Sequence, residues 1–199
     1  MEGPARTELS DGVLVLRPWR LEDVPRVTEI CQDPEISRWT SVPSPYKEEH
    51  ARTWIEQTIR EWDDRRHAAF AVTDAGTGDV IGAIGLRFHE DYALQGSIGY
   101  WVAKEARGRG AATGALKLVS RWALVDLRLP RVQLITDPAN VPSQKVAERA
   151  GFTREGLLRS YFEIRGGRRD CVIFSLLERE LEDDNQGYEG TRWPSTSTS

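Results

Sequence analysis

Two segments in the first third of the chain carry apolar residues at the spacing of an amphipathic helix. In residues 21–31 they recur three positions apart, and in residues 47–66 they line one face of a mostly polar segment. The apolar positions of the longer segment are Ala51, Trp54, Ile55, Ile59 and Trp62. Between the two predicted helices, Asp33-Pro34 indicates a break, and the Ser- and Pro-rich residues 37–46 predict a loop.

Short apolar runs predict strands in much of the remaining chain. The predicted strands are residues 14–17, 69–72, 80–89, 95–102, 131–136, 153–164 and 168–177. The turn at residues 74–79 contains two glycines and predicts a hairpin. Two further helices are predicted at residues 110–125 and 143–150, and Gly151 suits a left-handed cap on the second. This order of elements predicts one α+β domain with a mixed sheet.

The composition supports one folded domain followed by a tail. The chain has 199 residues, of which 39% are hydrophobic and 29% charged, as is ordinary for a globular protein. We expect the domain to span residues 1–182. Residues 183–199 are polar and rich in Gly, Ser and Thr, which predicts a flexible tail; Tyr188 and Trp193 are its aromatic residues.

Charge and residue inventory exclude several classes of protein. The net charge of −4 lacks the basic footprint of a non-specific nucleic-acid binder and argues against docking on an anionic membrane. No apolar run is long enough to predict a membrane-spanning helix, and residues 1–11 carry no apolar run like that of a signal peptide. Cys31 and Cys171 fit no zinc spacing and the three histidines share no helical spacing, so we expect reduced, buried cysteines and no metal site. These features predict a cytoplasmic protein.

The segment at residues 98–112 carries the most chemical information. A predicted strand runs into a loop with Gly108 and Gly110, and a predicted helix follows at once. The glycines allow backbone N–H groups to turn toward one point, the helix N-terminus adds its positive dipole end, and Arg107 and Arg109 add full charges. The pattern predicts a cradle for a pyrophosphate. The alternative is a Gly-rich turn that begins a helix and carries two solvated arginines.

This segment resembles a signature of the GNAT superfamily of acyl-CoA-dependent N-acetyltransferases. Arg107-Gly108-Arg109-Gly110-Ala111-Ala112 matches the pattern [QR]-x-x-G-x-[GA], which in that superfamily holds the pyrophosphate of CoA. Over residues 14–177 the chain looks most like the Rim branch, whose better-known members acetylate the N-termini of ribosomal proteins. The segments that carry this likeness are Leu16-Arg17-Pro18, Ile98-Gly99-Tyr100-Trp101-Val102, Asn140-Val141-Pro142-Ser143 and Ala147-Glu148-Arg149-Ala150-Gly151-Phe152.

The resemblance implies a fold and an activity. The implied fold is a mixed, mostly antiparallel sheet of seven strands flanked by about four helices. The implied enzyme transfers an acyl group, with acetyl as the default, from acetyl-CoA directly to a primary amine and uses no metal. The amine is the α-amine of a protein N-terminus or, as an alternative, belongs to a small molecule or antibiotic. A different class remains open, a CoA-binding module without turnover, and so do a monomer and a homodimer.

The resemblance also implies roles for residues outside the cradle. Trp101 and Val102 lie on the strand whose exposed edge pairs with the pantetheine arm of CoA. Asn140 contacts CoA, and Ser143 lies near the thioester sulfur, where it protonates the departing thiolate. The residues themselves leave a second role open for each: Asn140 could bond backbone groups instead, and Ser143, between a strand and a helix, suits the N-cap.

The general base is the least determined group. The acceptor amine must be neutral to attack a thioester, and a carboxylate commonly removes its proton directly or through water. Glu163 lies in the last predicted hairpin, where the Rim branch can carry a functional glutamate, although Phe162 aligns better and Glu163 also suits a surface position. Glu90 and Asp91 follow a central strand near the expected acceptor entrance, and Glu155 is a further candidate.

Aromatic residues predict the acceptor pocket. The first two helices, the loop at residues 37–46 and the last hairpin are expected to form it. Their aromatic residues are Trp39, Tyr46, Trp54, Tyr161 and Phe162. Trp39 and Tyr46 are the better candidates because they lie in the predicted loop, whereas helical aromatics favour the core. An aromatic and partly acidic entrance suits a cationic amine.

Overall fold

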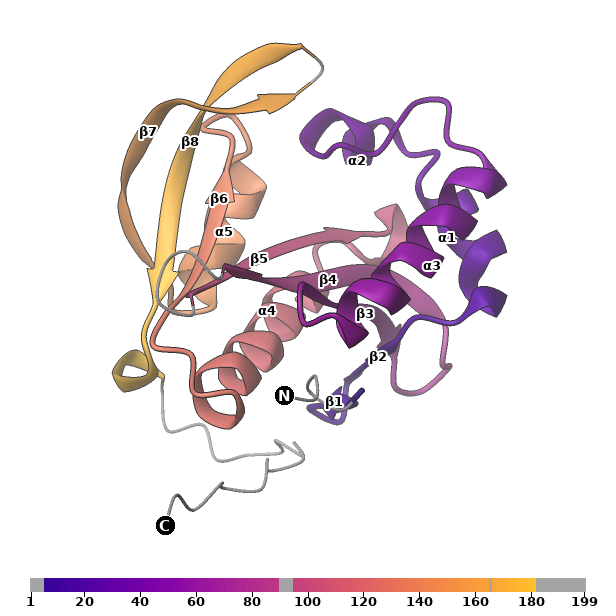
Figure 1. Ribbon diagram of the computed structural model, residues 1–199, viewed down its shortest axis with the longest axis horizontal. Helices are drawn as coiled ribbons and strands as arrows, with labels where there is room; N and C mark the ends of the chain where they lie inside the picture. The colour runs from indigo at the N-terminus through magenta and orange to yellow at the C-terminus, as the bar shows by residue number, and fades with distance from the viewer. Residues whose placement is uncertain (1–5, 90–94, 165, 182–199) are drawn as a thin grey trace.

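The computed structural model describes residues 6–89, 95–164 and 166–181 and contains one mixed sheet (Figure 1). In the described residues the sheet has eight strands in the order β1-β2-β3-β4-β5-β6-β8-β7. The strands are β1 (Leu9–Ser10), β2 (Leu14–Pro18), β3 (His67–Asp74), β4 (Val80–His89), β5 (Gln95–Val102), β6 (Val132–Thr136), β7 (Thr153–Ile164) and β8 (Gly167–Leu176). The α+β class is confirmed, and the expected count of seven was one too low because the two-residue β1 pairs with β2.

Helices cover both faces of this sheet (Figure 1). They are α1 (Val24–Ile30), α2 (Pro34–Trp39), α3 (Glu48–Asp63), α4 (Ala111–Arg121) and α5 (Val141–Arg149). A π-helical turn, Trp122–Asp126, continues α4. The expectation of about four helices omitted α2, which occupies part of the predicted loop.

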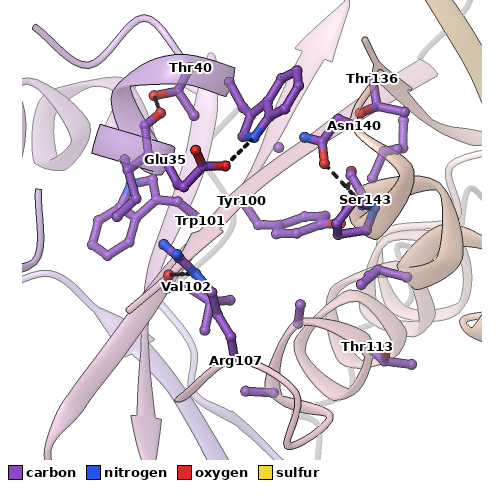
Figure 2. A pocket seen from close by; sticks show the side chains of 18 of the residues that line it. Glu35, Thr40, Tyr100, Trp101, Val102, Arg107, Thr113, Thr136, Asn140 and Ser143 are labelled. Atoms are coloured by element: carbon purple, nitrogen blue, oxygen red, sulfur yellow. Dashed lines mark hydrogen bonds between the residues drawn. The ribbon is translucent and has the colours of Figure 1, made fainter. Parts of the chain in front are cut away.

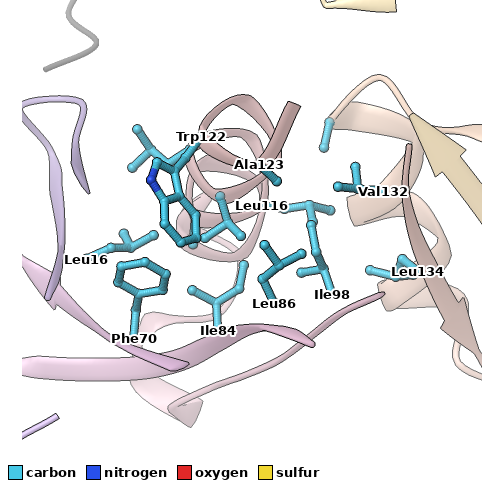
Figure 3. Close-up of a cluster of buried hydrophobic side chains, with 14 of the residues drawn as sticks. Leu16, Phe70, Ile84, Leu86, Ile98, Leu116, Trp122, Ala123, Val132 and Leu134 are labelled. Atoms are coloured by element: carbon cyan, nitrogen blue, oxygen red, sulfur yellow. The ribbon is translucent and has the colours of Figure 1, made fainter. Parts of the chain in front are cut away.

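Alternation along β3 separates two hydrophobic clusters. Phe70 packs with Leu116 and Trp122 of the α4 region in the larger cluster (Figure 3). Val72 belongs to the same cluster. Ala69 and Ala71, one position out of phase, join α1 and α3 in the smaller cluster. Successive strand residues point to opposite faces, so a continuously apolar strand belongs between two helical layers.

Two helices begin where the sequence indicated a break or a later start. Asp33 accepts a hydrogen bond from the N–H of Glu35 at 3.0 Å and caps α2, with Pro34 as its first residue. Asn140 caps α5 in the same way, so that helix starts before Ser143. Proline in the first turn of a helix costs no hydrogen bond, because that N–H has no partner within the helix.

The sheet opens between β5 and β6. These parallel neighbours pair only at Gly96 with Val132 and at Ser97 with Gln133. Beyond Ser97, β5 remains paired to β4 through Val102, and β6 remains paired to β8 through Thr136. The two halves of the sheet therefore diverge, and beyond Ser97 no strand of the described residues pairs with this edge of β5.

Candidate active site

A cavity of about 480 Å³ fills the opening between β5 and β6. Its walls come from both strands, α2, α5, the loop before α4, and Phe162 of β7. Figure 2 shows side chains from these elements around one space. A cavity of this size is typical of a site for a cofactor or small ligand.

The loop before α4 forms one end of the cavity. Gly108 and Gly110 have φ angles of +75° and +86°, which L-residues rarely adopt, and a Cβ atom at either would meet no atom within 4 Å. Gly110 is the N-cap of α4, whose first N–H groups have no partner within the helix. Gly108, Gly110, Ala111 and Ala112 all line the cavity. Open space beside free N–H groups at a helix start fits the pyrophosphate predicted for this loop.

The two arginines of the loop differ in position. Arg107 lines the cavity, donates from Nε to the carbonyl oxygen of Val102 at 3.1 Å and forms an ion pair with Asp33 at 2.6 Å. Arg109 is not among the cavity-lining residues. Arg107 is therefore the arginine that the structure brings to the cavity, and it is also bound to the start of α2.

The unpaired edge of β5 presents backbone groups to the cavity. The N–H of Gly96 points to β6, where it donates to Arg131 O at 3.3 Å. Strand alternation then directs the N–H groups of Ile98, Tyr100 and Val102 to the same side, beyond the point where pairing ends. Trp101 also lines the cavity. This edge fits an extended chain with amide groups, such as the pantetheine arm.

A pair of hydroxyl groups lies inside the cavity (Figure 2). The hydroxyl of Tyr100 is 3.0 Å from Oγ of Ser143. The N–H of Ser143 donates to Oδ1 of Asn140 at 3.2 Å, so Asn140 is the helix cap and the alternative role predicted for Ser143 is wrong. Burial raises the pKa of Tyr100 to about 12, so its hydroxyl keeps its proton at neutral pH.

The carboxylates predicted as bases are distributed differently. Glu163 is exposed on β7 and is not a cavity-lining residue, whereas Phe162, one position earlier, is. Glu155 accepts two hydrogen bonds of 2.6 Å from Arg131 and one from Ser175, and these lower its pKa to about 2. Such a carboxylate is a poor base at neutral pH.

Glu90 and Asp91, the remaining candidate bases, lie outside the described residues. The sequence reasoning missed two carboxylates that line the cavity, Glu35 and Asp137. Oε2 of Glu35 accepts a hydrogen bond from Nε1 of Trp39 at 3.1 Å, one turn along α2. Oδ1 of Asp137 accepts from the N–H of Ala139 at 2.8 Å and so shapes the turn before α5. Glu35 was missed because its segment was expected to be irregular.

The predicted aromatic residues separate into three environments. Trp39 and Phe162 line the cavity, and the guanidinium of Arg38 lies 4.5 Å from the centre of the Trp39 ring. Tyr46 is buried in the smaller hydrophobic cluster, so its predicted place in the pocket is wrong. Trp54 packs on Trp19 and Trp101 in the same region. Tyr161 is an exposed residue of β7.

Cys31 and Cys171 are buried free thiols, and burial raises their pKa values to about 12 and about 11. Across residues 6–89, 95–164 and 166–181, no group of three or more His, Cys, Asp or Glu side chains is arranged to hold a metal ion. Within the same ranges no helix is long and apolar enough to cross a membrane.

Comparison with known proteins places these features in one family. The family profile described as an acetyltransferase (GNAT) domain matches residues 14–153. The Bacillus subtilis protein named "Putative ribosomal N-acetyltransferase YdaF" is 35% identical over 137 residues, which are 67% of this chain and 74% of that protein. Escherichia coli (strain K12) spermidine N(1)-acetyltransferase is 24% identical over 166 residues, 83% of this chain and 86% of that protein.

A solved structure, Mycobacterium smegmatis RimJ in complex with CoA-disulfide, superposes with a TM-score of 0.77 at 25% identity and covers 89% of this chain and 88% of that one. The family match spans the cradle loop, the diverging strands and Ser143. The match covers every residue that lines the cavity except Phe162, and enzymes of this family use acetyl-CoA. The chain belongs to the GNAT acetyltransferase family and is an acyl-CoA-dependent N-acetyltransferase.

Proposed function

We propose that this enzyme acetylates the α-amine at the N-terminus of a protein. The observation that carries the proposal is the shape of the cavity, which joins the cradle loop to α2 and Phe162 on the far side of the opened sheet. An acyl donor held along β5 thus presents its reactive end toward an entrance built by other elements. The named likenesses to a ribosomal N-acetyltransferase and to RimJ favour a protein N-terminus.

The cofactor half of the site is assigned to residues already placed around the cavity. The N–H groups of the cradle, with Arg107 beside them, hold the pyrophosphate, and the edge of β5 at Tyr100 and Val102 binds the pantetheine amides. Asn140 fixes the start of α5 and with it Ser143. Acetyl-CoA supplies the activated acyl group.

Acyl transfer needs a proton delivered to the departing sulfur and protons removed from the acceptor amine. Ser143 donates a proton to the departing sulfur and is held in position by Tyr100 and by its own N–H bond to Asn140. Of the predicted bases, Glu163 is exposed and does not line the cavity, and Glu90 lies outside the described residues. Glu35 lines the cavity with a carboxylate that Arg38 partly neutralises through an ion pair of 3.3 Å, and its remaining charge attracts an ammonium group before transfer.

A small polycationic amine is the second candidate acceptor. The likeness to spermidine N(1)-acetyltransferase and the carboxylates Glu35 and Asp137 in the cavity favour it. Trp39 adds less than predicted to cation binding, because Arg38 already lies over its ring. The basic group of Arg38 at this entrance disfavours a compact polycation and tolerates a peptide.

An acceptor screen with acetyl-CoA distinguishes these activities. We expect transfer to peptides with a free α-amine, no transfer to the same peptides when N-terminally blocked but carrying lysine, and weak transfer to spermidine. Preference for spermidine would replace the first proposal with the second. If no amine is acylated in a single-turnover experiment although CoA still binds, the result would indicate a binding module. Succinyl-CoA in parallel tests the length of the acyl group.

A further inference from the structure

We infer that His67, oriented by Glu61, is the base that takes the proton from the acceptor amine. The inference rests on the proposed acylation of an amine, but not on whether that amine belongs to a protein or a small molecule. His67 begins β3 and Glu61 lies in the last turns of α3, both outside the residues that line the cavity.

Glu61 and His67 form a partly buried carboxylate–imidazole pair. Oε2 of Glu61 lies 3.3 Å from Nδ1 of His67, and Oε1 accepts a hydrogen bond from Nε2 of Gln57 at 2.9 Å. Burial opposes ionisation of Glu61, but the bond from Gln57 and the charge of Arg87 outweigh it and lower its pKa. An ionised carboxylate only accepts hydrogen bonds, so Nδ1 of His67 carries the hydrogen and the lone pair is on Nε2.

Two glycines, which carry no side chain, lie between this lone pair and the cavity. A Cβ atom on Gly85 would lie only 2.2 Å from Nε2 of His67, so the imidazole sits directly over Gly85. Gly85 is the strand partner of Gly99 on β5. Gly99 lines the cavity, and a Cβ atom there would meet nothing within 4 Å. Neighbouring strands are about 4.8 Å apart, a separation that one or two water molecules would span.

Gly99 lies where acyl transfer is expected to take place. Pairing between β5 and β6 ends at Ser97, so Gly99 lies at the start of the opening and beside Tyr100, which contacts Ser143. The base and the acid therefore approach the cavity from opposite sides. Glu61 acts through His67 and is a positioning residue.

The charge state of His67 suits a base. Burial, with the positive charge of Arg87 next, lowers its pKa although Glu61 acts in the opposite direction, so the imidazole is neutral at neutral pH. The charged groups that act on it are Glu61 on α3, which contacts it directly, and Arg87 on β4, which lies 3.8 Å from Glu61. A side chain exposed to 16% still admits water.

The proton balance is complete with the groups named. An ammonium acceptor loses two protons on becoming an amide. The first passes through water to Nε2 of His67 and then to solvent. The second leaves the nitrogen as the C–N bond forms, and the sulfur, whose bond to the carbonyl carbon breaks, receives a proton through Ser143.

The test compares the pH dependence of kcat/KM in His67→Gln and the wild type, with a basic amine and with an amine that is neutral at pH 7. For the basic amine we expect the variant to lose about 100-fold in kcat/KM and to lose the acid limb that reports the imidazole. The neutral amine needs no deprotonation before attack, so its loss should be at least tenfold smaller. CoA affinity should stay within about twofold.

Two controls separate catalysis from folding. His50→Gln removes another histidine of α3 that lies outside the cavity and should leave kcat/KM unchanged per folded enzyme. Glu61→Gln keeps a hydrogen-bond acceptor but removes the charge that stabilises the imidazolium, so its acid limb should move to lower pH. This second variant decides the question if His67→Gln fails to fold.

An unchanged pH profile in both variants would overturn the inference. An equal loss for both amines would do the same, because it would indicate a structural histidine. If no amine is acylated by the wild type, the proposed function fails before this test begins, so the two failures are distinguishable.

Discussion

The hydroxyl of Tyr100 lies 3.0 Å from Oγ of Ser143, across the opening between β5 and α5. This contact joins the unpaired strand edge to the helix on the other wall of the cavity (Figure 2). Because Asn140 already caps α5, the Ser143 hydroxyl has no role in starting the helix. It is available for the departing thiolate.

We therefore expect Ser143→Ala to lower kcat by about tenfold or more while CoA affinity and melting temperature remain near those of the wild type. Tyr100→Phe should give a smaller loss, because Ser143 keeps its own proton. Asn140→Ala is the stability control and should cost about 1 kcal/mol of unfolding free energy through the lost cap. If Ser143→Ala instead lowers the melting temperature with full turnover, the acid role is wrong.

Substitution of Gly110 tests the cradle. The φ angle of +86° strains any L-residue, but asparagine tolerates this region better than most, and a Cβ atom meets open space. Gly110→Asn is therefore a matched control for Gly110→Glu, which places a negative charge at the phosphate position. Calorimetry should show CoA binding at least tenfold weaker for Gly110→Glu, about 1.4 kcal/mol. Equal CoA affinities in the two folded variants would contradict the assignment of this loop to the pyrophosphate.

The ion pair between Arg107 and Asp33 links the cradle to α2 at 2.6 Å. Asp33→Asn keeps an N-cap for α2 but removes the charge that competes with phosphate for the guanidinium. We expect CoA binding to become about threefold tighter, with a steeper dependence on salt, as attraction between unlike charges requires. Weaker binding would show instead that Asp33 holds Arg107 in its binding orientation.

The sequence predicted the parts of the site that depend on local order. The cradle was found because glycine, arginine and a helix start follow one another within a few residues. Asp33-Pro34 was interpreted as a break, although a capping side chain followed by proline also begins a helix. That single choice hid α2 and with it Glu35.

Other features depend on register between distant strands and have no local signal. Glu163 and Phe162 exchange faces with a shift of one residue, so the predicted hairpin did not decide which of them reaches the cavity. The path from His67 to the cavity requires Gly85 to be opposite Gly99, which only the pairing of β4 and β5 establishes.

Glu155 provides a test of pH-dependent stability. Its folded pKa of about 2 lies below its ordinary value of 4.5, chiefly because of Arg131 and then Ser175. A depressed pKa stabilises the fold above the unfolded value and loses that effect as the pH falls from about 4.5 toward 2. Glu155→Gln should be less stable at pH 7 by up to about 1 kcal/mol, since the pair is partly exposed.

Chemical denaturation of the wild type and Glu155→Gln at several pH values measures this difference. The two free energies of unfolding should converge as the pH approaches 2. Turnover per folded enzyme should be unchanged at pH 7, because the carboxylate is bound by Arg131 and Ser175 and does not line the cavity. A large loss of kcat without a loss of stability would return Glu155 to the list of bases.

The final prediction is that residues 183–199 are dispensable. Their composition buries too little apolar surface to offset a backbone ordering cost of about 1–2 kcal/mol per residue. The last described contacts with the core come before these residues: Leu181 packs on the larger hydrophobic cluster, and the N–H of Leu177 donates to Glu180 at 3.0 Å. Truncation after residue 182 should leave melting temperature and transfer rate near those of the full chain, the rate within about twofold. Truncation after Leu177 is the matched control and should lower stability, because it removes Leu181. A large loss of activity in the longer form would assign Tyr188 and Trp193 to the acceptor site or to a subunit interface.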